Sequence, residues 1–181
     1  MPTLTHEFDW PDRVVVGTIG SPGARTFYLQ ARAGARTASV VLEKEQSAVL
    51  AEMIDRLLDE VIAQSDGNHS IPTVVPAELV DDEPLDLPLV EEFRTGSMKL
   101  SWDPRTAQVV VEAYPITDAE TDDADDEPEP AEVFLVRMPV GTARAFVQRT
   151  RLVVGSGRPP CPRCGAPMDA DGHVCALPED S

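Results

Sequence analysis

The first forty residues show the pattern of β-branched and aromatic runs, broken by turn residues, that is typical of short strands. Three such runs predict strands at 14–19, 26–31 and 37–42, with turns at a Ser-Pro-Gly sequence and at Gly34. Residues 44–64 then repeat apolar positions at three-four spacing, which predicts an amphipathic helix. We expect the following residues to form its core-facing side: Val49, Leu50, Met53, Ile54, Leu57, Leu58, Val61 and Ile62.

The same order of elements recurs in the second half of the chain. Strands are predicted at 94–102, 108–114 and 133–136, followed by a helix at 140–153. We therefore expect an α+β fold of two antiparallel three-stranded sheet-plus-helix units, a repetition that an internal duplication would explain. The expected organisation is a first unit at 1–64, a Pro-rich acidic connector at 65–92, a second unit at 93–154 and a metal-binding tail at 155–181.

The net charge of −17 is concentrated in two segments. Residues 78–92 carry seven acids and residues 118–132 carry nine, and neither segment contains Lys or Arg. The remaining sixteen acids nearly balance the fifteen bases, so the acidity belongs to these segments and not to the whole surface. The 118–132 segment has too few apolar residues to pack, and we expect a disordered loop.

All three cysteines lie in one short C-terminal stretch. Cys161-Pro-Arg-Cys164 has the two-residue spacing of zinc knuckles, and His173 lies two residues before Cys175. Residues two apart on an extended strand face the same side, so Cys161, Cys164, His173 and Cys175 can complete a tetrahedron. A filled tetrahedron predicts a structural zinc ion.

Two other interpretations of this stretch stay open. The cysteines could be reduced thiols in a tail to which His173 is unrelated. Alternatively, three protein ligands and a water molecule would form a Lewis-acid site, as in a metal-dependent hydrolase.

Arginines accumulate toward the same end of the chain, where residues 133–168 contain no acidic side chain. They could form an anion-binding face for a phosphorylated small molecule or for nucleic acid. No exposed aromatic residues that could stack on bases interleave with them, which argues against single-stranded nucleic acid. One hypothesis is that the 118–132 loop occupies this face; the alternative is two unrelated solvated segments. The face would consist of Arg144, Arg149, Arg151, Arg158 and Arg163.

Evidence for an enzyme is weak, because only three histidines are present and no nucleophile–base pair is apparent. The sequence lacks an apolar run long enough to cross a bilayer, and residues 1–9 do not resemble a signal peptide. An odd number of closely spaced cysteines is also unlike a disulfide framework. These features predict a cytoplasmic protein.

The motif from Gly157 to Cys175, Gly-Arg-Pro-Pro-Cys-Pro-Arg-Cys-Gly-x-Pro-Met-Asp-x-x-Gly-His-x-Cys, resembles the C-terminal signature of domain of unknown function 3090, an uncharacterised actinobacterial family. Phe8-Asp9-x-Pro11-Asp12-Arg13 and residues 42–46 are also similar to it. The resemblance implies no activity. Genes of the family accompany those of a phosphatidylinositol-kinase-like and a histidine-phosphatase-like protein, which implies either phosphate metabolism or a shared complex. We therefore expect a non-catalytic zinc-binding accessory protein.

Overall fold

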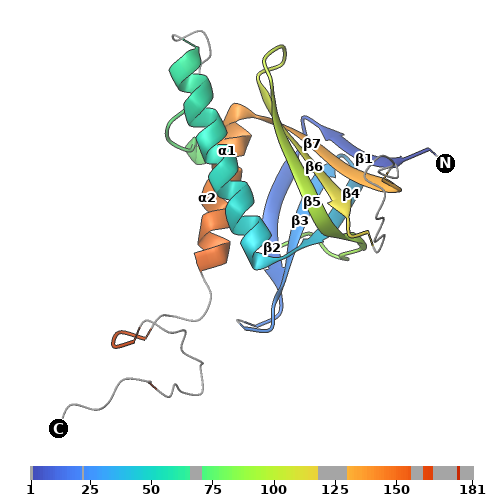
Figure 1. Ribbon diagram of the computed structural model, residues 1–181, viewed down its shortest axis with the longest axis vertical. Helices are drawn as coiled ribbons and strands as arrows, with labels where there is room; N and C mark the ends of the chain where they lie inside the picture. Colours follow the sequence, from blue (N-terminus) through green and yellow to red (C-terminus); the bar gives the residue numbers. More distant parts are fainter. Residues whose placement is uncertain are drawn as a thin grey trace, which may run out of the picture.

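The computed structural model describes residues 2–21, 23–65, 71–117, 130–155, 161–164 and 175. Within this part of the chain, seven strands form one sheet and two α-helices pack against each other beside it (Figure 1). The α+β class predicted from the sequence is therefore confirmed. The elements in chain order are β1 (Leu4–Asp9), β2 (Arg13–Ile19), β3 (Thr26–Ala33), β4 (Arg36–Leu42), α1 (Lys44–Gln64), the short 3-10 helix η1 (Ala77–Leu79), β5 (Glu91–Asp103), β6 (Gln108–Pro115), β7 (Glu132–Pro139) and α2 (Val140–Gly155).

The strands are arranged in the order β1-β7-β6-β5-β4-β3-β2. Strands β2 to β4 form one antiparallel meander and β5 to β7 another, and each meander is followed by a helix. The sequence predicts two separate three-stranded units, and this division is not confirmed. Parallel pairing of β4 with β5, in which Ser39 is opposite Glu91, joins both meanders into a single sheet.

Strand β1 was not predicted from the sequence, because four of its six residues are polar and only Phe8 is buried. It pairs in parallel with β7, with Leu4 opposite Glu132. Glu132 therefore belongs to a strand, although the sequence places it in the acidic 118–132 loop. Residues 118–129 of that predicted loop lie outside the described residues.

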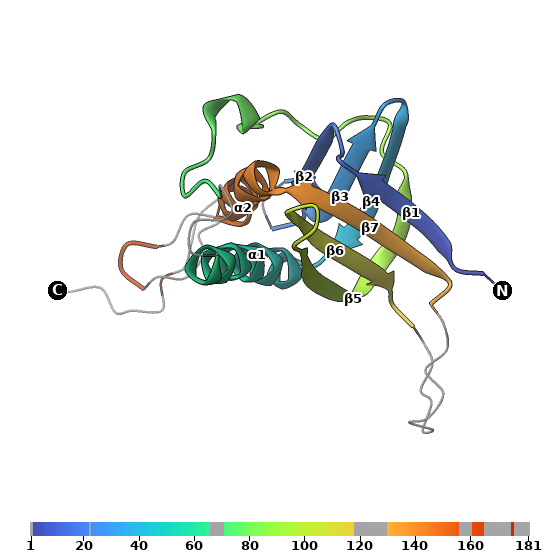
Figure 2. The same cartoon turned by 90° about the horizontal axis from the view of Figure 1, so that it is seen from above.

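The sheet curls around an aliphatic and aromatic core, so that β1 also contacts β3 (Figure 2). The rings of Phe8 and Phe134 lie 5.7 Å apart between their centroids. Both halves of the chain contribute to the same core, which includes Val16, Leu29, Val40, Ile54, Leu58, Val111, Phe134, Met138 and Phe146.

The connector before β5 packs on the outer side of the first meander. Leu85 is buried there, and Gln30 exchanges hydrogen bonds with the backbone of Asp86 at 2.8 and 3.1 Å. A Cβ atom at position 17 would lie 2.6 Å from the Leu85 side chain, which explains the glycine in this strand. Gly20 has a φ of 106° in the turn between β2 and β3, as the hairpin requires.

Helix α1 begins where the backbone N–H of Glu43 donates to the side chain of Gln46 at 2.8 Å. Leu50, Ile54 and Leu58 are buried, whereas Val49 and Met53 are 56% and 46% exposed. The core-facing side is thus narrower than the sequence predicts: Ala51 joins these three in the core, and Leu57 packs against it.

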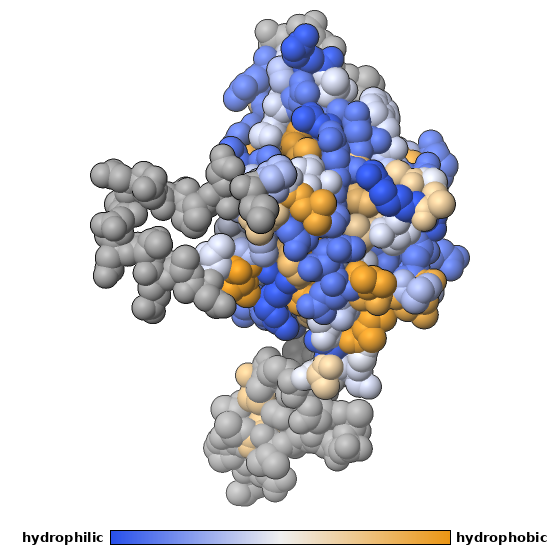
Figure 3. All heavy atoms as spheres, turned by 90° about the vertical axis from the view of Figure 1, so that its right-hand side faces the viewer, coloured by the Kyte–Doolittle hydropathy of each residue, from blue (hydrophilic) through white to orange (hydrophobic). Residues whose placement is uncertain are grey.

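No helix in the described residues is long and apolar enough to cross a membrane. The side of the molecule on which β1 lies in Figure 1 is mainly hydrophilic, with small apolar patches between the polar residues (Figure 3).

Two neighbouring residues of α1 allow a matched test of this packing. Replacing the fully buried Ile54 by Ala should lower the free energy of unfolding by about 3 kcal/mol through lost contacts and a residual cavity. Met53→Ala, at a half-exposed position, should change it by less than about 0.5 kcal/mol. Urea unfolding followed by circular dichroism measures both, and equal losses would contradict the described orientation of the helix.

Candidate metal centre

The three cysteines come together after α2. Cys161 is buried, while Cys164 and Cys175 are half-buried, and none of the three forms a disulfide. Their sulfur atoms all lie within 4.8 Å of one another. Residues 161–164 form the turn that the two-residue spacing predicts, which brings Cys164 back toward Cys161. The structure therefore places the three predicted sulfur ligands close together.

The turn also favours the ionised form of Cys161. The backbone amides of Cys164 and Arg163 donate to its sulfur and lower the pKa of the thiol from 9.0 to about 6. The side chains of Cys164 and Cys175 act in the same direction. Metals bind the thiolate and not the thiol, so this turn prepares Cys161 as a ligand.

The sulfur cluster is compatible with a tetrahedral metal ion. Zinc–sulfur bonds of about 2.3 Å in a tetrahedron place sulfur atoms about 3.8 Å apart, within the observed limit. Three close cysteines can thus hold a metal ion. The predicted fourth ligand, His173, lies outside the described residues.

Three of the five predicted anion-binding arginines pair with carboxylates of the same chain. Arg144 is 7% exposed and contacts Asp55 at 2.6 Å and Asp59 at 3.0 Å, so it links α2 to α1. Arg151 reaches the other oxygen of Asp55 at 3.2 Å. The remaining members are Arg149, which is described below, Arg163, which lies in the cysteine turn, and Arg158, which is outside the described residues.

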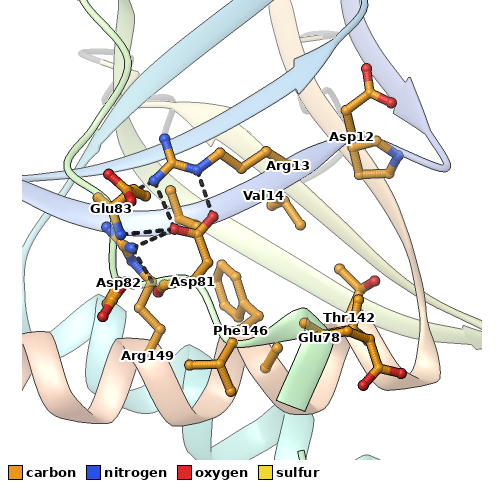
Figure 4. Close-up of a pocket in the computed structure, with 15 residues that line it drawn as sticks. Asp12, Arg13, Val14, Glu78, Asp81, Asp82, Glu83, Thr142, Phe146 and Arg149 are labelled. Atoms are coloured by element: carbon orange, nitrogen blue, oxygen red, sulfur yellow. Dashed lines mark hydrogen bonds and ion pairs between the residues drawn. The ribbon is translucent and has the colours of Figure 1, made fainter. Parts of the chain in front are cut away.

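Arg149 belongs to a second cluster, which lines a pocket of about 290 Å³ between β2, the connector and α2 (Figure 4). Its guanidinium donates to the Asp81 carboxylate at 3.1 Å and to the Val16 carbonyl at 3.0 Å. Arg13 contacts the same carboxylate at 2.6 and 3.0 Å. The hydrogen bond from Arg13 lowers the pKa of Asp81, while burial lowers the pKa of Arg149.

The sequence did not predict this Arg13–Asp81–Arg149 cluster. Asp81 lies in the acidic 78–92 segment, which reads as solvated because its acids have no nearby bases in the sequence. In the fold, arginines from β2 and α2 supply those bases. Arg144, Arg149 and Arg151 are therefore paired with carboxylates of the same chain, which does not favour binding of an external anion by these three arginines.

Titration of the metal-free protein tests the ionised state of Cys161. The difference in ultraviolet thiolate absorbance between wild type and Cys161→Ser should rise with pH. Its midpoint should lie near pH 6, because the amides of the turn stabilise the thiolate. A midpoint near the ordinary value of 9.0 would contradict the described turn.

The two arginines that share Asp55 allow a matched comparison. Arg144→Ala should lower the free energy of unfolding by about 2 kcal/mol, because it removes a buried guanidinium together with its ion pairs to Asp55 and Asp59 and its hydrogen bond to the Pro72 carbonyl. Arg151→Ala removes a pair that is 53% exposed on the arginine side and should cost about 0.5 kcal/mol or less. Denaturant unfolding measures both values, and a larger loss for Arg151→Ala would contradict these roles.

Comparison with known proteins gives one match. No curated protein and no solved structure matches the chain significantly. The profile of the family described as protein of unknown function (DUF3090) matches residues 6–175, which include most of β1, the six other strands, both helices and all three cysteines. The chain therefore belongs to the DUF3090 family.

Proposed function

We propose that this protein is a non-catalytic, zinc-binding accessory protein. The ion would be bound by Cys161, Cys164 and Cys175, with His173 as the fourth ligand. The convergence of three sulfur atoms within 4.8 Å is the observation that carries this proposal.

The chemistry of the donor set favours zinc and a structural role. Thiolates are soft ligands that select zinc over magnesium, calcium or manganese. When a fourth protein ligand completes the tetrahedron, no position stays open for water or substrate. Such an ion stabilises the tail that follows α2 and performs no turnover. Cysteines that form no disulfide fit a reducing compartment, and we propose the cytoplasm.

The globular body offers a surface for a protein partner. An open groove of about 680 Å³ lies between α1 and β5, and it is lined mainly by apolar side chains. Val49 and Met53 on α1 and Met98 and Leu100 on β5 contribute to it, and the first two are exposed. Exposed apolar residues that cluster in a groove are typical of interaction sites. The partner that we propose is the phosphatidylinositol-kinase-like or the histidine-phosphatase-like protein.

Metal analysis of the purified full-length chain tests the zinc proposal. We expect about one zinc ion per chain, and its loss in Cys161→Ser and Cys164→Ser because each removes a thiolate. Arg163→Ala, between the two cysteines, is the matched control and should retain the ion. Zinc that persists in both cysteine variants, or its absence from the wild-type protein, would overturn the proposal.

The same preparations test the accessory role. Zinc-loaded protein should capture the purified kinase-like or phosphatase-like protein, and Met53→Glu in the groove should weaken this capture at least tenfold. Val74→Glu places the same charge at an exposed valine that does not line the groove, and it should leave capture unchanged. Failure to capture either protein, or equal effects of both variants, would exclude this partner surface.

A further inference from the structure

A second group of metal-ligating side chains lies on three strands of the sheet. His6 on β1, Glu92 on β5 and Glu132 on β7 place one donor atom each within 4.8 Å of the other two. The Nε2 atom of His6 is 3.0 Å from Glu132 Oε2 and 3.9 Å from Glu92 Oε2. These residues share no atom or segment with the cysteine cluster.

The pairing of β1 with β7 explains why His6 and Glu132 meet. His6 precedes the buried Phe8 by two residues, so both lie on the inner side of β1. Glu132 likewise precedes the buried Phe134 by two residues on β7, the strand that runs parallel to β1. Two strands therefore direct an imidazole and a carboxylate to the same side of the sheet.

Glu92 reaches the group from an irregular part of the sheet. In the pairing of β4 with β5, the step from Ser39 to Val41 is opposite the longer step from Glu91 to Arg94. Glu92 lies inside this irregularity. Extra residues of this kind change the direction of a side chain, and they are frequent next to functional sites.

Electrostatics favours a cation between these side chains. Two carboxylates this close repel each other, and within the described part of the chain their only ion-pair partner is His6. If His6 served only to form a hydrogen bond between strands, Glu132 would be a sufficient partner and a second carboxylate would not be needed. Glu92 Oε2 is too far from Nε2 for a hydrogen bond, yet it faces the same nitrogen atom. A shared metal ion accounts for both carboxylates.

The distances and the exposure fit a metal ion as well. Bonds of about 2.0–2.2 Å to nitrogen and oxygen place neighbouring ligand atoms about 3–3.5 Å apart, which small side-chain shifts achieve here. All three side chains are half-buried, so one side of the group faces solvent. An imidazole with two carboxylates suits divalent first-row transition metals, whereas magnesium and calcium prefer oxygen ligands alone.

We propose that His6, Glu92 and Glu132 form a binding site for a divalent first-row transition metal, separate from the zinc site of the tail. The three protein ligands leave coordination positions that water or a small oxygen anion can occupy. The site does not depend on the cysteines, so it can be tested while the tail holds zinc.

Binding of Mn²⁺ to the zinc-loaded full-length protein tests this site. Manganese suits carboxylate ligands and competes poorly for thiolates, so it reports on this group and not on the cysteines. Electron paramagnetic resonance of free Mn²⁺ should show saturable binding of about one ion per chain. Glu92→Gln should raise the Kd at least tenfold, because it removes a charged ligand without changing the shape of the side chain.

Two further variants separate a specific site from general attraction to negative charge. Glu91→Gln removes an exposed carboxylate from the neighbouring position of β5 and should leave the Kd within about twofold. His6→Gln removes no negative charge, yet it should weaken binding at least tenfold. Absence of saturable binding, equal effects of Glu91→Gln and Glu92→Gln, or unchanged binding in His6→Gln would each overturn the proposal.

Discussion

The parallel pairing of β4 with β5 is the constraint on which the fold depends. Neighbouring parallel strands cannot be joined by a tight turn, so the chain must cross the sheet between them. Helix α1 and the connector through η1 provide this crossing. The crossing places the helix beside α2 and lays the connector over β2 and β3, where Leu85 and Asp86 are held.

The same crossing explains the role of the acidic connector. It brings Asp81 and Asp86 to the buried side chain of Arg13. Arg149 on α2 pairs with Asp81 as well. Burying a guanidinium is costly unless carboxylates and carbonyls satisfy it, and this cluster supplies both. Two of the seven acids in this segment, Asp81 and Asp86, thus hold the connector to the sheet, and Asp81 also holds it to the second helix.

Local patterns predicted most elements, because periodicity depends on residues close in sequence. The helix at 44–64 and six of the seven strands follow from such patterns, and the cysteine spacing indicated which thiols would meet. Relations between distant segments were not predictable in this way. Strand β1 consists mostly of polar residues, the joining of the meanders has no local signal, and Arg144 and Arg149 have their partners far away in sequence. The second candidate site could not be predicted from a spacing motif, because its residues, His6, Glu92 and Glu132, lie on strands that are far apart in the sequence.

The position of β1 at the edge of the sheet affects how the protein can fold during synthesis. Its partner strand lies far along the chain, as the separation of 126 residues between His6 and Glu132 shows. The ribosome therefore releases β1 long before β7 exists, whereas β2, β3 and β4 can pair as soon as they emerge. Contacts between such distant residues slow folding, and an unpaired strand is exposed to aggregation in the meantime. The polar residues of β1 reduce that risk. The polar composition that made this strand unpredictable from the sequence therefore also protects the nascent chain from aggregation.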